Sequence, residues 1–120
     1  MSDEEIIAEI LDEGLDDWIP IDGLISLVKR EGKESEEDLR NATIRILRLL
    51  LEGRMVTVGE LGESGFESWP ESVDDAEGAL LRVVEDLDRL DWFPQGASCW
   101  IANTPLGDAE AVRNRESREI

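Results

Sequence analysis

The sequence predicts an α+β fold in which three N-terminal helices pack on a small antiparallel sheet. Three observations support this fold class. Three amphipathic patterns with helical spacing fill residues 2–52. Two short runs at 54–58 and 97–102 are apolar or β-branched and follow a glycine, as strands commonly do. A further helical pattern separates the two runs, so we expect these strands to pair across an insertion.

The N-terminal third of the chain is predicted to begin with two helices joined by a short extended piece. Ser2 starts a capping box, and Gly14 ends the first helix. Residues 18–19 are extended. Pro20 suits the first turn of the second helix, which Gly32 closes.

Residues 35–71 are predicted as a long helix, a strand and a loop. Ser35 caps a helix over 36–52, and Gly53 is its C-terminal end. The β-branched run at 54–58 predicts the strand. Residues 60–71 are rich in Gly, Glu and Ser and contain a proline, which favours a loop.

The next segment is predicted as a fourth helix followed by the second strand. Ser72 and Asp75 stand at capping-box spacing, and the apolar residues up to Leu90 fit a 3.6-residue period. The run at 97–102 is the expected partner of the strand at 54–58.

The predicted order of helix, short strand, helix, helix, strand, insertion, strand is that of a winged-helix-like domain. Residues 36–52 take the position of the recognition helix, and a loop plus a fourth helix over 60–96 replaces the wing. We expect this single domain to span 1–104. Residues 105–120 are expected to form a polar C-terminal tail, which can extend as a frayed helix through Ala109 and Val112.

The composition is strongly acidic. Thirty Asp and Glu residues against 12 Lys and Arg give a formal net charge of −18. A field of this sign repels nucleic acid and anionic membrane surfaces and attracts basic proteins. The chain start lacks the cations of a signal peptide, and no apolar stretch approaches the ~20 residues that cross a bilayer. We therefore expect a cytoplasmic protein with a protein partner and no membrane association, and the charge disfavours nucleic acid as a partner.

Catalytic and metal-binding chemistry is not expected. The chain has no His and no Tyr, so histidine-based triads and histidine-ligated zinc are excluded. The acids over 12–22 lack the spacing of a calcium-binding loop. The single cysteine, Cys99, lies in an apolar run and is expected to be buried. The prediction is no enzyme activity, no cofactor and no metal.

Three of the tryptophans suggest specific roles. Trp18 and Trp100 fall on predicted strands, where core packing is expected. Trp69 lies with Phe66 in the acidic loop, and it either pins the loop to the core or presents a binding hot spot. The pin is the favoured interpretation.

A set of short motifs also points to a family. The motifs are Asp17-Trp18, Leu50-Leu51-Glu52-Gly53, Gly65-Phe66 with Trp69, and Cys99-Trp100 running to Thr104 and Gly107. Over about residues 15–107 the chain thereby resembles small uncharacterised actinobacterial winged-helix-like proteins. The resemblance implies the fold and a bacterial origin, and it carries over no catalytic or ligand residue. The chain departs from the pattern at Asn103, where such proteins place an apolar residue, and in lacking a short wing.

The predicted function is binding of a basic partner protein. Its most concrete form is an immunity or antitoxin-type protein that neutralises a basic, nuclease-like toxin domain. The insertion over 60–94 carries eleven acids against two arginines, a net charge of −9, and additions to a scaffold are where function concentrates. The predicted partner-binding residues are Glu63, Phe66, Glu67, Trp69, Glu71, Asp74 and Asp75.

Three other interpretations stay open. The first helix has an acidic patch of its own, formed by Glu9, Asp12, Glu13 and Asp16. A transcription regulator would instead bind DNA through Arg40, Arg45, Arg48 and Arg54. The acids of the helix over 36–52 reduce its net charge to −1, which disfavours that role. A structural subunit of a larger complex is the third hypothesis.

Overall fold

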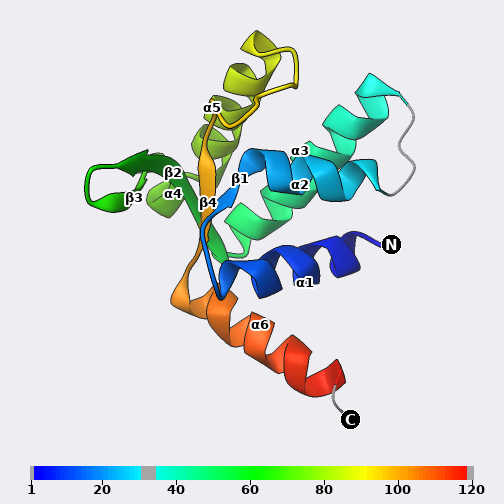
Figure 1. The fold of residues 1–120 in the computed structure, drawn as a ribbon, viewed down its shortest axis with the longest axis vertical. Coiled ribbons are helices and arrows are strands. Elements are labelled where there is room, and N and C mark those ends of the chain that lie inside the picture. Colours follow the sequence, from blue (N-terminus) through cyan, green and yellow to red (C-terminus); the bar gives the residue numbers. More distant parts are fainter. Residues whose placement is uncertain (1, 31–34, 119–120) are drawn as a thin grey trace.

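The computed structural model describes residues 2–30 and 35–118 and, within these ranges, shows an α+β chain of six helices and a four-stranded antiparallel sheet (Figure 1). The helices are α1 (Asp3–Gly14), α2 (Ile21–Lys29), α3 (Glu36–Glu52), α4 (Glu71–Asp74), α5 (Ala76–Arg89) and α6 (Pro105–Arg118). The strands are β1 (Ile19–Pro20), β2 (Val56–Gly62), β3 (Gly65–Ser68) and β4 (Trp100–Asn103), in the spatial order β1-β4-β2-β3. None of the helices in the described ranges is long and apolar enough to span a membrane.

Side-chain caps begin two of the predicted helices. The Ser2 hydroxyl accepts the Glu5 N–H at 3.2 Å at the start of α1, and the Ser35 hydroxyl accepts the Asp38 N–H at 3.0 Å at the start of α3. Each bond satisfies a backbone donor that the first helical turn leaves open. The predicted end of the second helix at Gly32 lies outside the described residues.

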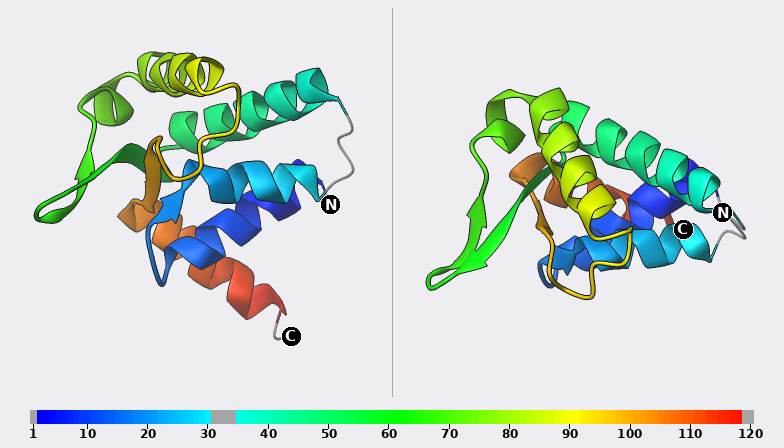
Figure 2. Two further views of the ribbon diagram at one scale, coloured as in Figure 1. Left: turned by 45° about the horizontal axis from the view of Figure 1, so that its top comes forward. Right: turned by 90° about the horizontal axis from the view of Figure 1, so that it is seen from above.

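The core lies between the helices and one face of the sheet. Helix α1 packs against α6, and α3 packs against both α2 and α5 (Figure 2). Every one of these elements contributes to a single apolar cluster. Its fully buried side chains include Ile10, Leu24, Leu50, Val58, Leu87, Ile101 and Ala111.

The predicted pairing of the two apolar runs is confirmed. Strands β2 and β4 are antiparallel, with Val58 opposite Ile101, and β1 adds on the other side of β4 with Ile19 opposite Ile101. Asn103 lies at the end of β4 and donates from Nδ2 to the Leu11 carbonyl of α1 at 2.8 Å. The polar residue at this position therefore ties the sheet to the first helix.

The predicted loop over 60–71 is wrong over residues 60–68, which form a β-hairpin, and at residue 71, which begins α4. Strand β2 runs past the predicted end, and the chain turns at residues 63–64 into β3, so that Leu61 pairs with Phe66. Gly65 has a φ of +106°, a conformation open to glycine and rarely adopted by other residues. The glycines that indicated a loop instead permit a tight hairpin.

A break at Asp75 divides the predicted fourth helix. Ser72 does not cap it, because the Ser72 hydroxyl lies inside α4 and donates to the Trp69 carbonyl at 2.8 Å. Asp75 has a non-helical backbone, with φ −141° and ψ 85°, and its carboxylate accepts the Gly78 N–H at 2.9 Å. Asp75 is thus itself the N-cap of α5.

The residues after 104, predicted as a polar tail, form helix α6 against α1. Gly107 is buried so close to the chain before β2 that an added Cβ would lie 2.0 Å from the Met55 carbonyl oxygen. Ala111 is fully buried. Small residues make this contact, so the helix lacks the large apolar stripe by which a sequence pattern reveals a packed helix.

Candidate functional site

The hairpin of β2 and β3 forms an arm, defined as residues 59–68, that projects from the helical body (Figure 2). Its side chains alternate between two faces, because successive residues of a strand point to opposite sides of the sheet. Leu61 and Phe66 pair on one face, and Glu60 and Glu67 pair on the other. The two faces have different chemistry.

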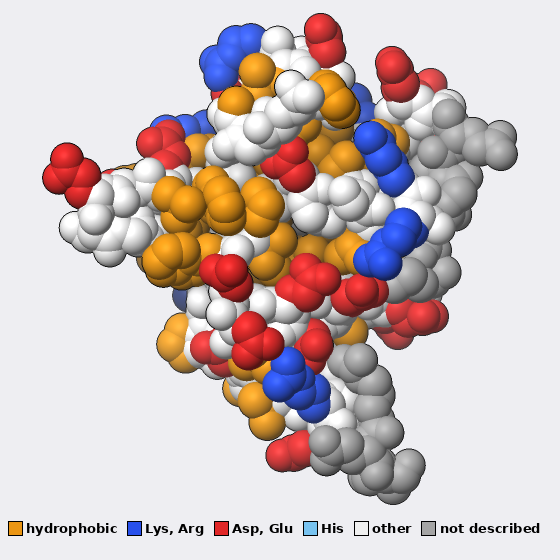
Figure 3. All heavy atoms as spheres, in the orientation of Figure 1, with side chains coloured by type: hydrophobic (Ala, Val, Ile, Leu, Met, Phe, Trp, Pro, Cys, Tyr) orange, Lys and Arg blue, Asp and Glu red, His pale blue; other side chains and the backbone are white. Residues whose placement is uncertain are grey.

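One face of the sheet carries exposed apolar side chains. We define this apolar face as Trp18, Pro20, Leu61, Phe66 and Trp100. Trp18 is 43% exposed and Leu61 is 44% exposed, whereas the other three are half-buried. Figure 3 shows hydrophobic side chains gathered over the strands on this side of the molecule.

The sequence predicts core packing for Trp18 and Trp100, and the structure places neither side chain in the core: Trp18 is exposed, and half-buried Trp100 lies on the apolar face, outside the core cluster. The Trp18 ring lies over the arm, with its centroid 6.2 Å from that of Phe66 and the planes inclined by 30°. It approaches Gly65 so closely that an added Cβ there would lie 2.9 Å from Trp18 Cη2. Ile19 takes the core-facing position, so strand alternation turns the preceding Trp18 outward.

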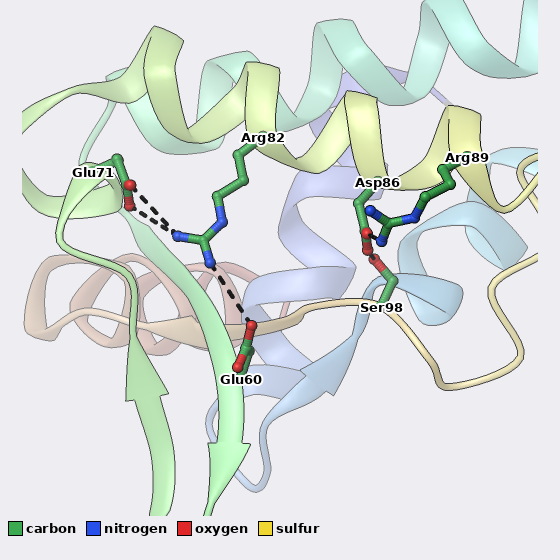
Figure 4. A network of polar contacts seen from close by, with 6 residues as sticks. All are labelled: Glu60, Glu71, Arg82, Asp86, Arg89 and Ser98. Atoms are coloured by element: carbon green, nitrogen blue, oxygen red, sulfur yellow. Dashed lines mark hydrogen bonds and ion pairs between the residues drawn. The ribbon is translucent and has the colours of Figure 1, made fainter.

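The other face of the arm borders a charged hollow of about 400 Å³ between β2, α5 and the segment that enters β4 (Figure 4). Arg82 of α5 reaches across it, with Cζ 3.8 Å from the centre of the Trp69 ring. Its Nη1 lies 3.3 Å from Glu71, and its Nη2 lies 3.8 Å from Glu60. The hollow is lined by Glu60, Trp69, Arg82, Glu85, Asp86, Arg89, Ala97, Ser98 and Cys99.

Carboxylates of this chain hold both arginines of the charged hollow. Asp86 pairs with Arg89 and also accepts the Ser98 hydroxyl at 2.6 Å (Figure 4). Burial raises the pKa of the Cys99 thiol to about 11, so the thiol stays protonated at neutral pH and is a poor nucleophile. The arginines of the charged hollow are thus paired with carboxylates of the same chain, and the Cys99 thiol is not activated as a nucleophile.

The favoured role of Trp69, pinning its segment to the core, is confirmed. Trp69 is 8% exposed, and its backbone N–H donates to the Val58 carbonyl at 2.8 Å. Its indole Nε1 is buried without a hydrogen-bond partner among the described residues. Trp69 therefore acts as an anchor at the base of the arm, covered by Arg82.

The predicted partner-binding residues do not form one patch. Phe66 and Trp69 are three positions apart on an extended chain, so their side chains point to opposite faces. Glu63 stands at the exposed tip of the arm. The others lie on the hollow side of the arm or along α4: Glu67, Glu71, Asp74 and Asp75. Among them, Glu71 pairs with Arg82 and Asp75 caps α5.

Three of the four arginines proposed as a DNA-binding face form ion pairs within the chain. Arg40 bonds Asp88 of α5 at 3.2 and 3.3 Å. Arg45 bonds Asp3 of α1, and Arg48 bonds Glu77 of α5, again each through two nitrogens. Arg54 is exposed and has no ion pair among the described residues.

These ion pairs shift the pKa values of their acids. Hydrogen bonds from Arg40 and then from Trp92 lower the pKa of Asp88. A hydrogen bond from Arg48 lowers the pKa of Glu77. Both carboxylates are thus charged at neutral pH and hold their arginines.

The acidic patch of the first helix is partly neutralised as well. Glu9 pairs with Arg30 at 3.2 Å. Arg115 of α6 pairs with Asp12 and lies 3.6 Å from Asp16. Glu13 remains exposed.

The apolar face was missed in the sequence because its members are far apart along the chain. Leu61 falls in a segment that its glycines and acids mark as a loop, and Trp18 falls in a predicted strand. The sequence signal that could have placed Leu61 on this face is strand alternation, because Thr57, Gly59 and Leu61 are alternate residues of β2 and share one face. This signal can be used only once β2 is known to continue past residue 58.

Comparison with known proteins identifies no relative. No protein-family model matches the sequence, and neither a curated protein nor a solved structure is significantly similar to it. What the chain binds is therefore inferred from its own geometry and charge.

Proposed function

We propose that this chain is an acidic protein-binding domain whose partner is a basic protein. The pairing of its arginines carries the proposal. Within the described residues, eight arginines form ion pairs with acids of the same chain: Arg30, Arg40, Arg45, Arg48, Arg82, Arg89, Arg113 and Arg115. Exposed carboxylates such as Glu13, Glu63 and Asp74 have no ion pair in the described ranges.

The surface charge left after this pairing is mainly negative. The net charge of −18 therefore acts outward, where it favours encounter with a basic surface and slows approach to nucleic acid. Complementary charge raises association rates and sets orientation more than it adds affinity. A basic protein partner matches this field.

The specific form that we propose is a cytoplasmic immunity or antitoxin-type protein that neutralises a nuclease-like toxin, without enzyme activity of its own. A nuclease surface is basic because it holds phosphates. Carboxylates of an acidic protein can occupy the positions of those phosphates. The exposed acids of α1 and of the arm are the candidates for this contact.

A winged-helix-like topology is part of the proposal. The order of α1, β1, α2, α3, β2 and β4 is that of the fold, and β4 lies between β1 and β2. The arm and α4–α5 stand where a short wing would join β2 to β4. Helix α3 takes the position of the recognition helix.

A DNA-binding regulator is the second candidate function, and exposed Arg54 is the observation that favours it. The other three arginines of this surface would first have to leave Asp88, Asp3 and Glu77. That exchange opposes binding, in addition to the repulsion from the whole chain.

The experiment tests whether this chain binds a basic protein or duplex DNA. Affinity capture from the source cells followed by mass spectrometry identifies a partner, which is then purified and titrated. We expect a partner of pI above about 9 whose association rate falls at least about tenfold between roughly 50 and 300 mM salt. We expect no shift of duplex DNA at ~150 mM salt. A shift at that salt that Arg54→Ala abolishes would establish the regulator instead.

Charge reversal tests whether the acids of α1 or those of the arm contact the partner. Glu13→Lys changes the first helix, and Glu63→Lys changes the tip of the arm. Both residues are exposed and unpaired among the described residues, so neither change breaks an ion pair of the fold. The variant with the larger fall in association rate marks the contact.

A further inference from the structure

The apolar face is exposed although most large apolar side chains of the chain are buried. Trp18 and Leu61 expose 43% and 44% of their surface, and they adjoin half-buried Phe66 and Trp100. Scattered exposed apolar residues are ordinary, whereas aromatic residues grouped on one face mark interaction surfaces. Water contact with such a group is unfavourable by roughly 25 cal/mol for each Å² of apolar area.

The local backbone supports this exposed arrangement. The Trp18 ring packs beside Phe66, and Gly65 lets the ring approach the backbone of the arm. A fixed aromatic ring loses little side-chain entropy on binding, which is why aromatic residues dominate binding hot spots. Trp18 is therefore a preorganised anchor.

Acids border the apolar face. Asp16 and Asp17 precede Trp18 and are exposed, and the Asp17 carboxylate accepts the Trp18 N–H at 2.8 Å. Glu63 stands at the tip of the arm, next to the pair of Leu61 and Phe66. Figure 3 shows acidic side chains along the edge of the hydrophobic patch that faces α1 and α6, and at the far tip.

The acids that border the apolar face restrict which molecule can dock on it. A second copy of the chain would bring two like-charged borders together, and each copy carries a net charge of −18. Nucleic acid is opposed by the same field. A protein segment with lysine or arginine beside apolar side chains satisfies both the face and its border.

We propose that the apolar face docks a segment of the partner in which apolar side chains alternate with lysine or arginine. This inference rests on the proposed function and assigns the contact to Trp18, Leu61, Phe66 and Trp100. The apolar side chains cover these four residues, and the long lysine or arginine side chains at the two ends of the segment bend around its edges to reach Asp17 and Glu63. The charged hollow on the opposite face takes no part.

Nuclear magnetic resonance can locate such a contact, because the four tryptophans provide four indole N–H signals. The ¹⁵N-labelled full chain is titrated with an alternating Lys-Val peptide of about eight residues, a length that spans a strand. We expect saturable shifts of the Trp18 and Trp100 indole signals. Those of Trp69 and Trp92 stay in place. Alternating Lys-Ser and Glu-Val peptides are expected to cause no saturable shift.

A matched pair of variants tests the assignment. Leu61→Ser removes an exposed member of the apolar face and weakens Lys-Val binding about tenfold. Leu81→Ser, on α5 and 58% exposed, leaves it unchanged. Equal affinities of the two variants would overturn the assignment.

The outcomes separate the inference from the proposed function. Saturable shifts confined to Trp69 or Trp92 refute the apolar face as the docking site but keep a basic partner. If neither the Lys-Val nor the Lys-Ser peptide binds, the result counts against both the docking face and the proposed basic partner. Equal binding of the Glu-Val peptide refutes the charge selection. Concentration-dependent self-association that Leu61→Ser abolishes shows that a second copy occupies the face.

Discussion

The guanidinium carbon of Arg82 lies 3.8 Å from the centre of the Trp69 ring, so a cation of α5 covers the residue that anchors the arm. The same guanidinium is within ion-pair distance of Glu60 on β2 and Glu71 on α4. One side chain therefore links three elements at the base of the arm.

Replacing this cation is expected to loosen the arm. Arg82→Gln removes both the cation–π contact and the two ion pairs, and we expect the free energy of unfolding to fall by about 1 kcal/mol. Arg89→Gln is the control, because its exposed pair with Asp86 lies within one helix and is worth about 0.5 kcal/mol or less. Urea denaturation followed by tryptophan fluorescence measures both. Equal losses would contradict the linking role of Arg82.

The backbone at Gly65 is expected to control the position of Trp18. Gly65→Ala places a Cβ at a φ of +106° and 2.9 Å from the Trp18 ring. We expect a loss of about 1–2 kcal/mol in unfolding free energy and a red-shifted Trp18 emission. Gly96→Ala is the control for backbone strain alone, because its φ is +80° and its Cβ would meet nothing within 4 Å. If Gly96→Ala shifts the emission equally, Trp18 is not held by Gly65.

Helix α6 is expected to belong to the cooperatively folded unit. Ala111→Asp places a charge at a fully buried position against α1, which should cost roughly 3 kcal/mol or more. Ala109→Asp makes the same change at an exposed position of the same helix and should cost about 0.5 kcal/mol or less. Thermal unfolding distinguishes the two. Similar melting temperatures would mean that residues 105–118 fold independently of the rest.

The ion pair of Arg40 and Asp88 is expected to contribute to stability only while Asp88 is ionised. The pKa of Asp88 is lower in the folded chain than its ordinary value, so its contribution is complete above that ordinary value, about 4. It is lost as the pH falls through the folded-state pKa. The stability difference between the native chain and Asp88→Asn should be constant from about pH 7 to 5 and shrink below about pH 4. Because the pair is exposed, we expect a difference below about 1 kcal/mol. A difference that grows on acidification would contradict this assignment.

Elements specified by neighbouring residues were predicted well. The caps at Ser2 and Ser35 involve backbone donors three residues away, and Gly53 follows the last residue of α3 as expected. The pairing of β2 with β4 was also predicted, because these are the two clearest strand patterns of the chain. The burial of Trp69 agrees with the favoured of its two interpretations, the one in which the ring pins its segment to the core.

Other features that depend on distant residues were not predicted. Strand β3 forms because Phe66 pairs with Leu61 across the turn. Helix α6 packs on the body because Gly107 and Ala111 are small enough to be buried in close contact with it. Neither contact leaves a periodic apolar pattern. Ser72 and Asp75 stood at capping spacing, yet packing at Trp69 placed Ser72 in a separate short helix.

The sequence by itself determined the charge, the absence of histidine chemistry and the locally capped helices, because each follows from composition or from residues a few positions apart. The tertiary structure decided which charges face outward. It brought Asp3, Glu77 and Asp88 to the arginines of α3 and grouped Trp18 with Leu61, Phe66 and Trp100. Ion pairs and apolar faces form between residues that are near in space, and the distance along the chain does not reveal them.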